Sequence, residues 1–88
     1  MQRNLGGRHR KTLAAIFERP TRADIRWTAA VALIRTLGGE ISEGRGSRVR
    51  FALNGRRAVF HRPHPRPDLV KGAVESLKDF LIEAGVVP

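Results

Sequence analysis

Residues 47–61 read SRVRFALNGRRAVFH, and this stretch decides the fold that the sequence predicts. Apolar and polar residues alternate along both of its halves, which is typical of strands that bury one face. The halves meet at Asn54-Gly55, the dipeptide that most strongly favours a two-residue type I′ turn between antiparallel strands. The sequence therefore predicts a β-hairpin with strands over 47–53 and 56–61.

A two-residue turn also fixes which residues of the two strands lie opposite each other. The predicted pairs run from Leu53 with Arg56 beside the turn to Arg48 with His61 at the far end. One face of the hairpin then collects the apolar residues Val49, Phe51, Leu53, Ala58 and Phe60. The other face collects Arg48, Arg50, Ala52, Arg57, Val59 and His61. We expect the first face to be buried and the second to be an exposed cationic surface with one imidazole.

Two amphipathic segments flank the hairpin and can cover its apolar face. The first is predicted to be a helix over 29–37, capped by Thr28, or by Asp24 a turn earlier, and ended by Gly38. The second is predicted over 69–84, where apolar residues recur at helical spacing.

The order of these elements predicts an α+β fold. A short strand over 40–42 adds to the hairpin, giving a small α-β-β-β-α domain with a three-stranded antiparallel sheet. Both main helices are expected on one face of that sheet, and a short additional helix precedes them near the N-terminus. We divide the chain into a flexible N-terminus (1–7), an N-terminal helical extension (8–24) and the main domain (25–88).

Length and composition narrow the function classes. A chain of 88 residues is one small domain with a thin core, so a deep cofactor pocket is not expected. It contains no Cys, which excludes a disulfide framework and a thiolate metal site, and we expect no metal and no cofactor. No apolar run approaches the ~20 residues of a membrane span, and no signal peptide is apparent, so we expect a cytoplasmic protein without membrane association.

Charge points to a polyanionic partner. The chain has 17 Lys and Arg against 8 Asp and Glu, a formal net charge of +9. Residues 45–66 contain many Arg and no acidic residue. A small, strongly basic domain suggests nucleic acid, an anionic membrane surface or an acidic protein as its partner. The membrane surface is the least expected of the three, because no predicted helix combines a basic face with large exposed apolar residues.

Several motifs, taken in order, resemble the HicA family of toxins. They are Trp27 with the helix leading to Leu37-Gly38-Gly39, GSRVRF at 46–51, His64-Pro65, KGAVESL at 71–77, and Ala84-Gly85. The match covers about Ile25 to Val86. The resemblance implies a double-stranded-RNA-binding-domain-like fold and a toxin of a type II toxin–antitoxin system. It further implies a metal-independent endoribonuclease that acts on mRNA and is neutralised by a HicB-like antitoxin, monomeric alone and hetero-oligomeric with that antitoxin.

The family's catalytic His follows Gly-Ser directly, and Arg48 occupies that position here. The predicted register offers a substitute, because His61 lies opposite Arg48 on the same face. Imidazole suits proton transfer near neutral pH, so we expect His61 to act as the general base. His64 is then an auxiliary acid or an RNA contact, and Arg48 and Arg50 would stabilise the negatively charged transition state.

A further set of residues, with Arg50 among them, is expected to contact RNA. They are Gly46, Ser47, Arg50, Arg57, Arg62 and Lys71. Two alternatives use the same basic face: a catalytically weak or inactive RNA-binding module, and a protein that mainly binds the antitoxin.

Overall fold

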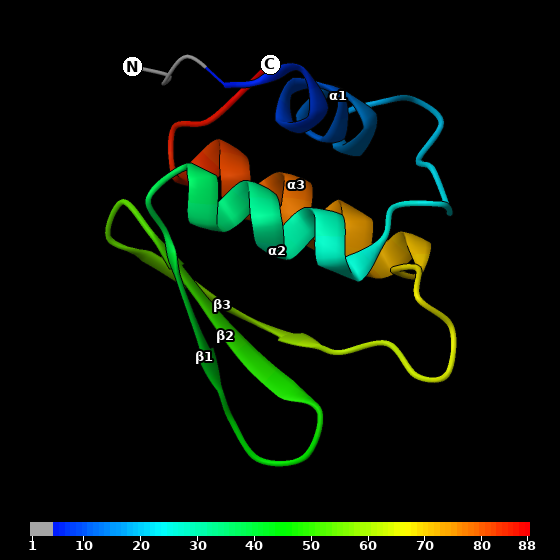
Figure 1. The fold of residues 1–88 in the computed structure, drawn as a ribbon, viewed down its shortest axis with the longest axis vertical. Helices are drawn as coiled ribbons and strands as arrows, with labels where there is room; N and C mark the ends of the chain where they lie inside the picture. The colour runs from blue at the N-terminus through cyan, green and yellow to red at the C-terminus, as the bar shows by residue number, and fades with distance from the viewer. Residues whose placement is uncertain (1–4) are drawn as a thin grey trace.

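The computed structural model describes residues 5–88, and its element order confirms the predicted α+β class (Figure 1). Met1–Asn4, part of the predicted flexible N-terminus, lie outside the described residues. The elements are α1 (Gly7–Ile16), α2 (Trp27–Thr36), β1 (Glu40–Glu43), β2 (Arg48–Leu53), β3 (Arg56–His61) and α3 (Lys71–Glu83). The strands form one antiparallel sheet in the order β1-β2-β3.

The turn between β2 and β3 has the predicted geometry. Asn54 has a φ of 50° and Gly55 a φ of 80°, so both central residues adopt the left-handed conformation that a type I′ turn requires. Every predicted pair of the two strands is confirmed, from Leu53 with Arg56 to Arg48 with His61. The side-chain amide of Asn54 also donates a 2.8 Å hydrogen bond to the carbonyl of Ala84, which ties the hairpin tip to the end of α3.

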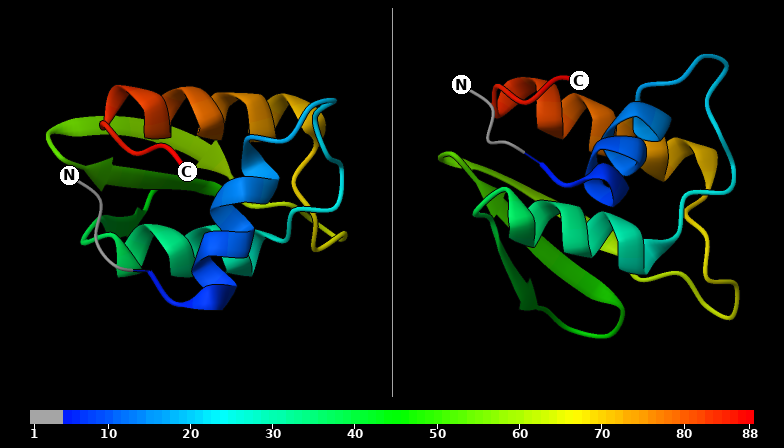
Figure 2. Two further views of the ribbon diagram at one scale, coloured as in Figure 1. Left: turned by 90° about the horizontal axis from the view of Figure 1, so that it is seen from above. Right: turned by 45° about the horizontal axis from the view of Figure 1, so that its top comes forward.

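The apolar face of the sheet packs against α2 and α3, as predicted (Figure 1). Phe51 lies at the centre of this layer, with its ring centroid 4.8 Å from that of Phe60, 5.6 Å from that of Trp27 and 6.4 Å from that of Phe80. These side chains come from β2, β3, α2 and α3, so burial of one ring links the sheet to both main helices. The opposite face of the sheet carries no helix and is open to solvent (Figure 2).

Both main helices begin two residues away from their predicted starts at 29 and 69. Arg26 forms an antiparallel bridge with Asp68, and the Leu69 N–H donates a 2.8 Å hydrogen bond to the Ile25 carbonyl. This pairing holds both approaches extended, so the later helix begins at Lys71 rather than Leu69. The earlier helix begins at Trp27, so neither Thr28 nor Asp24 is its N-cap.

The N-terminal helix α1 forms a third layer. It packs across α2 and α3 on the side away from the sheet (Figure 2). Leu13 and Ile16 of α1 are buried, and so is Leu5, a residue of the segment predicted to be flexible. The helix ends at Ile16, so only the first part of the predicted N-terminal helical extension (8–24) is helical. Within residues 5–88, none of the helices has the length and apolar character needed to cross a bilayer.

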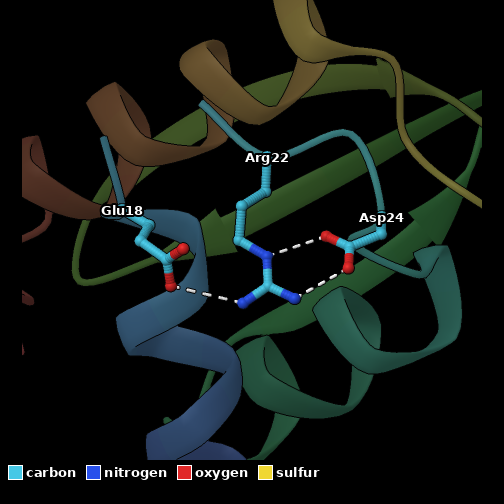
Figure 3. A network of polar contacts seen from close by, with 3 residues as sticks. All are labelled: Glu18, Arg22 and Asp24. Atoms are coloured by element: carbon cyan, nitrogen blue, oxygen red, sulfur yellow. Dashed lines mark hydrogen bonds and ion pairs between the residues drawn. The ribbon is translucent and has the colours of Figure 1, made fainter. Parts of the chain in front are cut away.

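An arginine joins the two ends of the segment between α1 and α2 (Figure 3). Arg22 donates hydrogen bonds of 2.8 and 2.7 Å to the two carboxylate oxygens of Asp24, and one of 3.3 Å to Glu18. These contacts raise the pKa of Arg22 and lower the pKa of the Asp24 carboxyl. The neighbouring Thr21 hydroxyl hydrogen-bonds to Glu75, which attaches the same segment to α3.

Because Ile16 is fully buried, α1 should be part of the cooperative unit. We expect Ile16→Ala to lower the free energy of unfolding by about 2–5 kcal/mol, through lost burial and the cavity that remains. Urea denaturation of the variant should still give one transition, with a lower midpoint. Arg10→Ala, at an exposed site on the same helix, is the control and should change the free energy by less than ~0.5 kcal/mol. An unchanged midpoint for Ile16→Ala would show that α1 is dispensable for stability.

Candidate nucleic-acid interface

The open face of the sheet presents the side chains predicted for it. Arg48, Arg50, Arg57, Val59 and His61 are exposed there, and Ala52 is partly buried. The Arg62 N–H donates a 2.8 Å hydrogen bond to the Ser47 carbonyl. Hydrogen-bonded and non-bonded pairs alternate along an antiparallel ladder, so Arg48 and His61 form a non-bonded pair, the type in which side chains approach most closely.

The first strand adds an acidic residue to this face. Glu40 lies opposite Ala52, and Ser42 lies opposite Arg50. Reasoning from the hairpin alone missed Glu40, because a four-residue strand carries too little pattern to fix its register from sequence. Glu40 lies toward the hairpin tip, so the end of the face that holds Arg48 and His61 stays cationic.

Ser47 and His61 are brought into direct contact at that end. The Ser47 Oγ lies 3.1 Å from His61 Nδ1, within hydrogen-bond distance. Ser47 is placed by the tight turn before β2, in which the Arg48 N–H donates a 3.1 Å hydrogen bond to the Arg45 carbonyl. Gly46 occupies that turn with a φ of 59°, a conformation in which other residues are strained. Since the Ser47 hydroxyl contacts Nδ1 of His61, the other ring nitrogen of His61, Nε2, is available to a ligand.

A hollow lies beside this pair, between the end of β3 and the start of α3. Its volume is about 540 Å³, and the predicted site residues that line it are His61, Arg62, His64 and Lys71. Arg66, which the sequence reasoning did not single out, also lines it. Asp68, which precedes α3, also lines the hollow, so its carboxylate offsets part of the positive charge of these cations and of the free amide groups at the start of α3. Arg50 and Arg57 are outside the lining of the hollow, on the exposed sheet face.

Arg62 differs from Arg50, Arg57 and Lys71, the other cationic residues predicted to contact RNA, because its charge is paired with a carboxylate. Its guanidinium donates hydrogen bonds of 3.2 and 2.6 Å to the two carboxylate oxygens of Glu43, and its central carbon lies 5.9 Å from the centroid of the Trp27 ring. This two-pronged contact lowers the pKa of the Glu43 carboxyl and raises that of Arg62. Arg62 is thus less available to an external anion than Arg50. No sequence signal joins these partners, which come together only when the sheet forms.

Across residues 5–88, no three His, Cys, Asp or Glu side chains lie close enough together to hold a metal ion.

Together, the fold and this surface define a small α+β domain with two helices behind a three-stranded sheet and a basic, exposed sheet face. Residues 27–86 match the family model described as HicA toxin of bacterial toxin–antitoxin systems. Because this match spans more than half of the chain, the protein belongs to the HicA toxin family, whose members generally pair with an antitoxin. The resemblance carried by the sequence motifs is thereby confirmed. No curated protein and no solved structure matches the chain.

The contact between Glu43 and Arg62 can be tested by titration. Arg62 favours the charged carboxylate, so the Glu43 titration should have its midpoint below that of an unpaired glutamate. Any stability that the pair adds to the fold is fully present at pH values above the pKa of Glu43 in the unfolded chain. It is lost as the pH falls through the lowered pKa of Glu43 in the folded protein. Carboxyl NMR should show the midpoint rising toward the ordinary value in Arg62→Gln. It should stay in place in Arg45→Gln, and an equal shift in both variants would refute the assigned pair.

Proposed function

We propose that this protein is the toxin of a type II toxin–antitoxin system and cleaves mRNA as a metal-independent endoribonuclease. A HicB-like antitoxin would neutralise it. The observation that carries the proposal is the contact of Ser47 Oγ with His61 Nδ1, on a basic sheet face directly beside Arg48. Because mRNA is the substrate, we infer that the protein acts in the cytoplasm.

In the proposed reaction, the RNA 2′-hydroxyl attacks the adjacent phosphorus. His61 acts as the general base through Nε2, which requires the tautomer whose Nδ1 carries the proton and donates it to Ser47 Oγ. Ser47 thus orients the imidazole in addition to being a phosphate contact. The 2′-oxygen–phosphorus bond forms while the bond to the 5′-oxygen breaks.

Two further steps complete the chemistry. The phosphorane gains negative charge as it forms, and the guanidinium groups of Arg48 and Arg50 would stabilise it from the same face. The departing 5′-oxygen needs a proton, and His64 is the proposed donor because it lines the hollow that His61 also lines. The products would be a 2′,3′-cyclic phosphate and a free 5′-hydroxyl.

The rest of the proposed RNA surface surrounds this centre. Gly46 and Ser47 would approach one phosphate from the turn, and Lys71 would reach another at the start of α3. Arg50 and Arg57 extend the track across the open sheet. Arg62 is proposed at the border of the track, with a smaller contribution because Glu43 holds its guanidinium.

A second candidate function has its own observation. Arg48 stands where the family's catalytic His follows Gly-Ser, so the basic face could bind RNA, or an antitoxin, without cleaving RNA. In either case we propose a monomer when the protein is alone and a hetero-oligomer with its antitoxin. Binding without cleavage would favour this candidate.

The catalytic proposal predicts the effect of removing His61. In the presence of a chelator, His61→Ala should cleave RNA at least ~100-fold more slowly than the unchanged protein, as expected when a general base is lost. Gel analysis of labelled RNA measures the rate, and the product ends should be the cyclic phosphate and 5′-hydroxyl. His9→Ala is the matched control, because His9 lies on α1, hydrogen-bonded to Thr36 and remote from the sheet face. Cleavage that survives His61→Ala unchanged would exclude His61 as the base.

The binding proposal predicts a change in salt dependence. Arg50→Ala should reduce the slope of log affinity for RNA against log salt concentration by ~0.7–0.9, the value for one lost phosphate contact. Fluorescence anisotropy at several salt concentrations measures the slope. Arg10→Ala, which removes an equal charge from α1, should leave the slope unchanged. Equal effects from both variants would mean that net charge, and not the sheet face, governs binding.

A further inference from the structure

The outer edge of β3 presents backbone groups that can bind another strand. The hydrogen-bonded pairs of the hairpin direct the N–H and C=O groups of Arg56, Ala58 and Phe60 toward β2. The alternating residues Arg57, Val59 and His61 therefore direct theirs away from the sheet. β3 is a border strand, so these groups face no other strand within the described chain.

The side chains of the same three residues all lie on the exposed face. Arg57 and His61 place a guanidinium and an imidazole at the two ends of this edge, and Val59 lies between them with 55% of its surface exposed. Val59 is one of four large apolar side chains exposed in residues 5–88. The edge thus combines outward backbone groups with a basic–apolar–basic pattern of side chains.

The other border of the sheet is different in length and charge. The Gly44 N–H donates a 2.8 Å hydrogen bond to the Arg48 carbonyl, so along β1 the outward backbone groups belong to Ile41 and Glu43. Ile41 is partly buried against the core, and the Glu43 carboxylate is held by Arg62. This edge is shorter than that of β3 and carries no basic residue at an outward position.

We propose that the β3 edge is the docking site for an extended segment of an acidic protein, which pairs with it as a fourth, antiparallel strand. The segment would place acidic side chains opposite Arg57 and His61 and an apolar side chain opposite Val59. Main-chain hydrogen bonds supply affinity in this mode of binding, and the alternating side chains supply specificity. This proposal depends on the proposed toxin function in one respect: the acidic segment is expected to come from the antitoxin.

Charge selects this occupant over a second copy of the chain. Pairing two β3 edges antiparallel about Val59 would bring Arg57 of one molecule beside His61 of the other, with no acid to compensate. An acidic segment gains favourable contacts at the same positions. Its side chains would also cover His61, so docking and RNA cleavage would exclude each other.

Amide hydrogen exchange on the full chain tests the proposal. The probe is the blocked peptide acetyl-Thr-Glu-Thr-Val-Thr-Glu-Thr-amide, which carries Glu, Val and Glu on one face of an extended strand. With peptide at saturation, the amides of Arg57, Val59 and His61 should exchange about tenfold more slowly, the effect of a modest net hydrogen bond. Those of Ile41 and Glu43 should not change. Protection at the β1 edge instead, or at neither edge, would overturn the proposal, as would protection of β3 without peptide at concentrations where the chain self-associates.

Matched variants separate backbone pairing from simple charge attraction. Val59→Pro removes an outward N–H while sparing the ladder to β2, and it should weaken peptide binding by about tenfold, whereas Val59→Thr keeps the N–H and should retain binding.

A peptide N-methylated at Glu, Val and Glu should lose binding to the unchanged protein, which tests the same point if Val59→Pro does not fold. A peptide with Lys for both Glu should not bind. Equal binding of the N-methylated peptide would overturn strand pairing. None of these measurements uses RNA, so their outcome is independent of whether the protein proves to be a nuclease.

Discussion

The left-handed turn at Asn54-Gly55 is the constraint on which the rest of the structure depends. Two consecutive residues with positive φ reverse the chain in the least possible length, and that fixes every partner along β2 and β3. A slip of one residue would turn Phe51 toward water and Arg50 into the core. The turn therefore determines which side chains of the sheet pack against the helices and which form the basic surface.

The chemistry of the candidate site is an outcome of this register and of two short connections. The tight turn before β2 places Ser47 against His61, and the pairing of residues 25–26 with 68–69 positions the start of α3 beside the same imidazole. A hydroxyl, an imidazole and several cations then converge from segments well separated in the sequence. Such a surface suits a polyanion, because its arginines outnumber the acids that could neutralise them.

The same edge connects the two proposed activities. Residues whose backbone faces outward along β3 have their side chains on the exposed basic face of the sheet, so a strand added at this border would lie against His61. The alternation of side chains along one antiparallel strand would thus provide both the proposed RNA-binding surface and the proposed means of blocking it. Arg62 would take a smaller part in RNA binding, because its pairing with Glu43 holds its guanidinium beside Trp27.

The sequence by itself determined the hairpin, its register, the two faces of the sheet and the presence of the flanking helices, because these depend on local turn chemistry and on hydrophobic period. Residue-level motifs also determined the family. The tertiary structure alone decided that the main helices begin at Trp27 and Lys71 and that Leu5 and α1 belong to the core. It also decided that Glu40 lies on the exposed face of the sheet and that Glu43 pairs with Arg62. These features depend on contacts between residues distant in the chain, and such contacts leave no periodic trace in an 88-residue sequence.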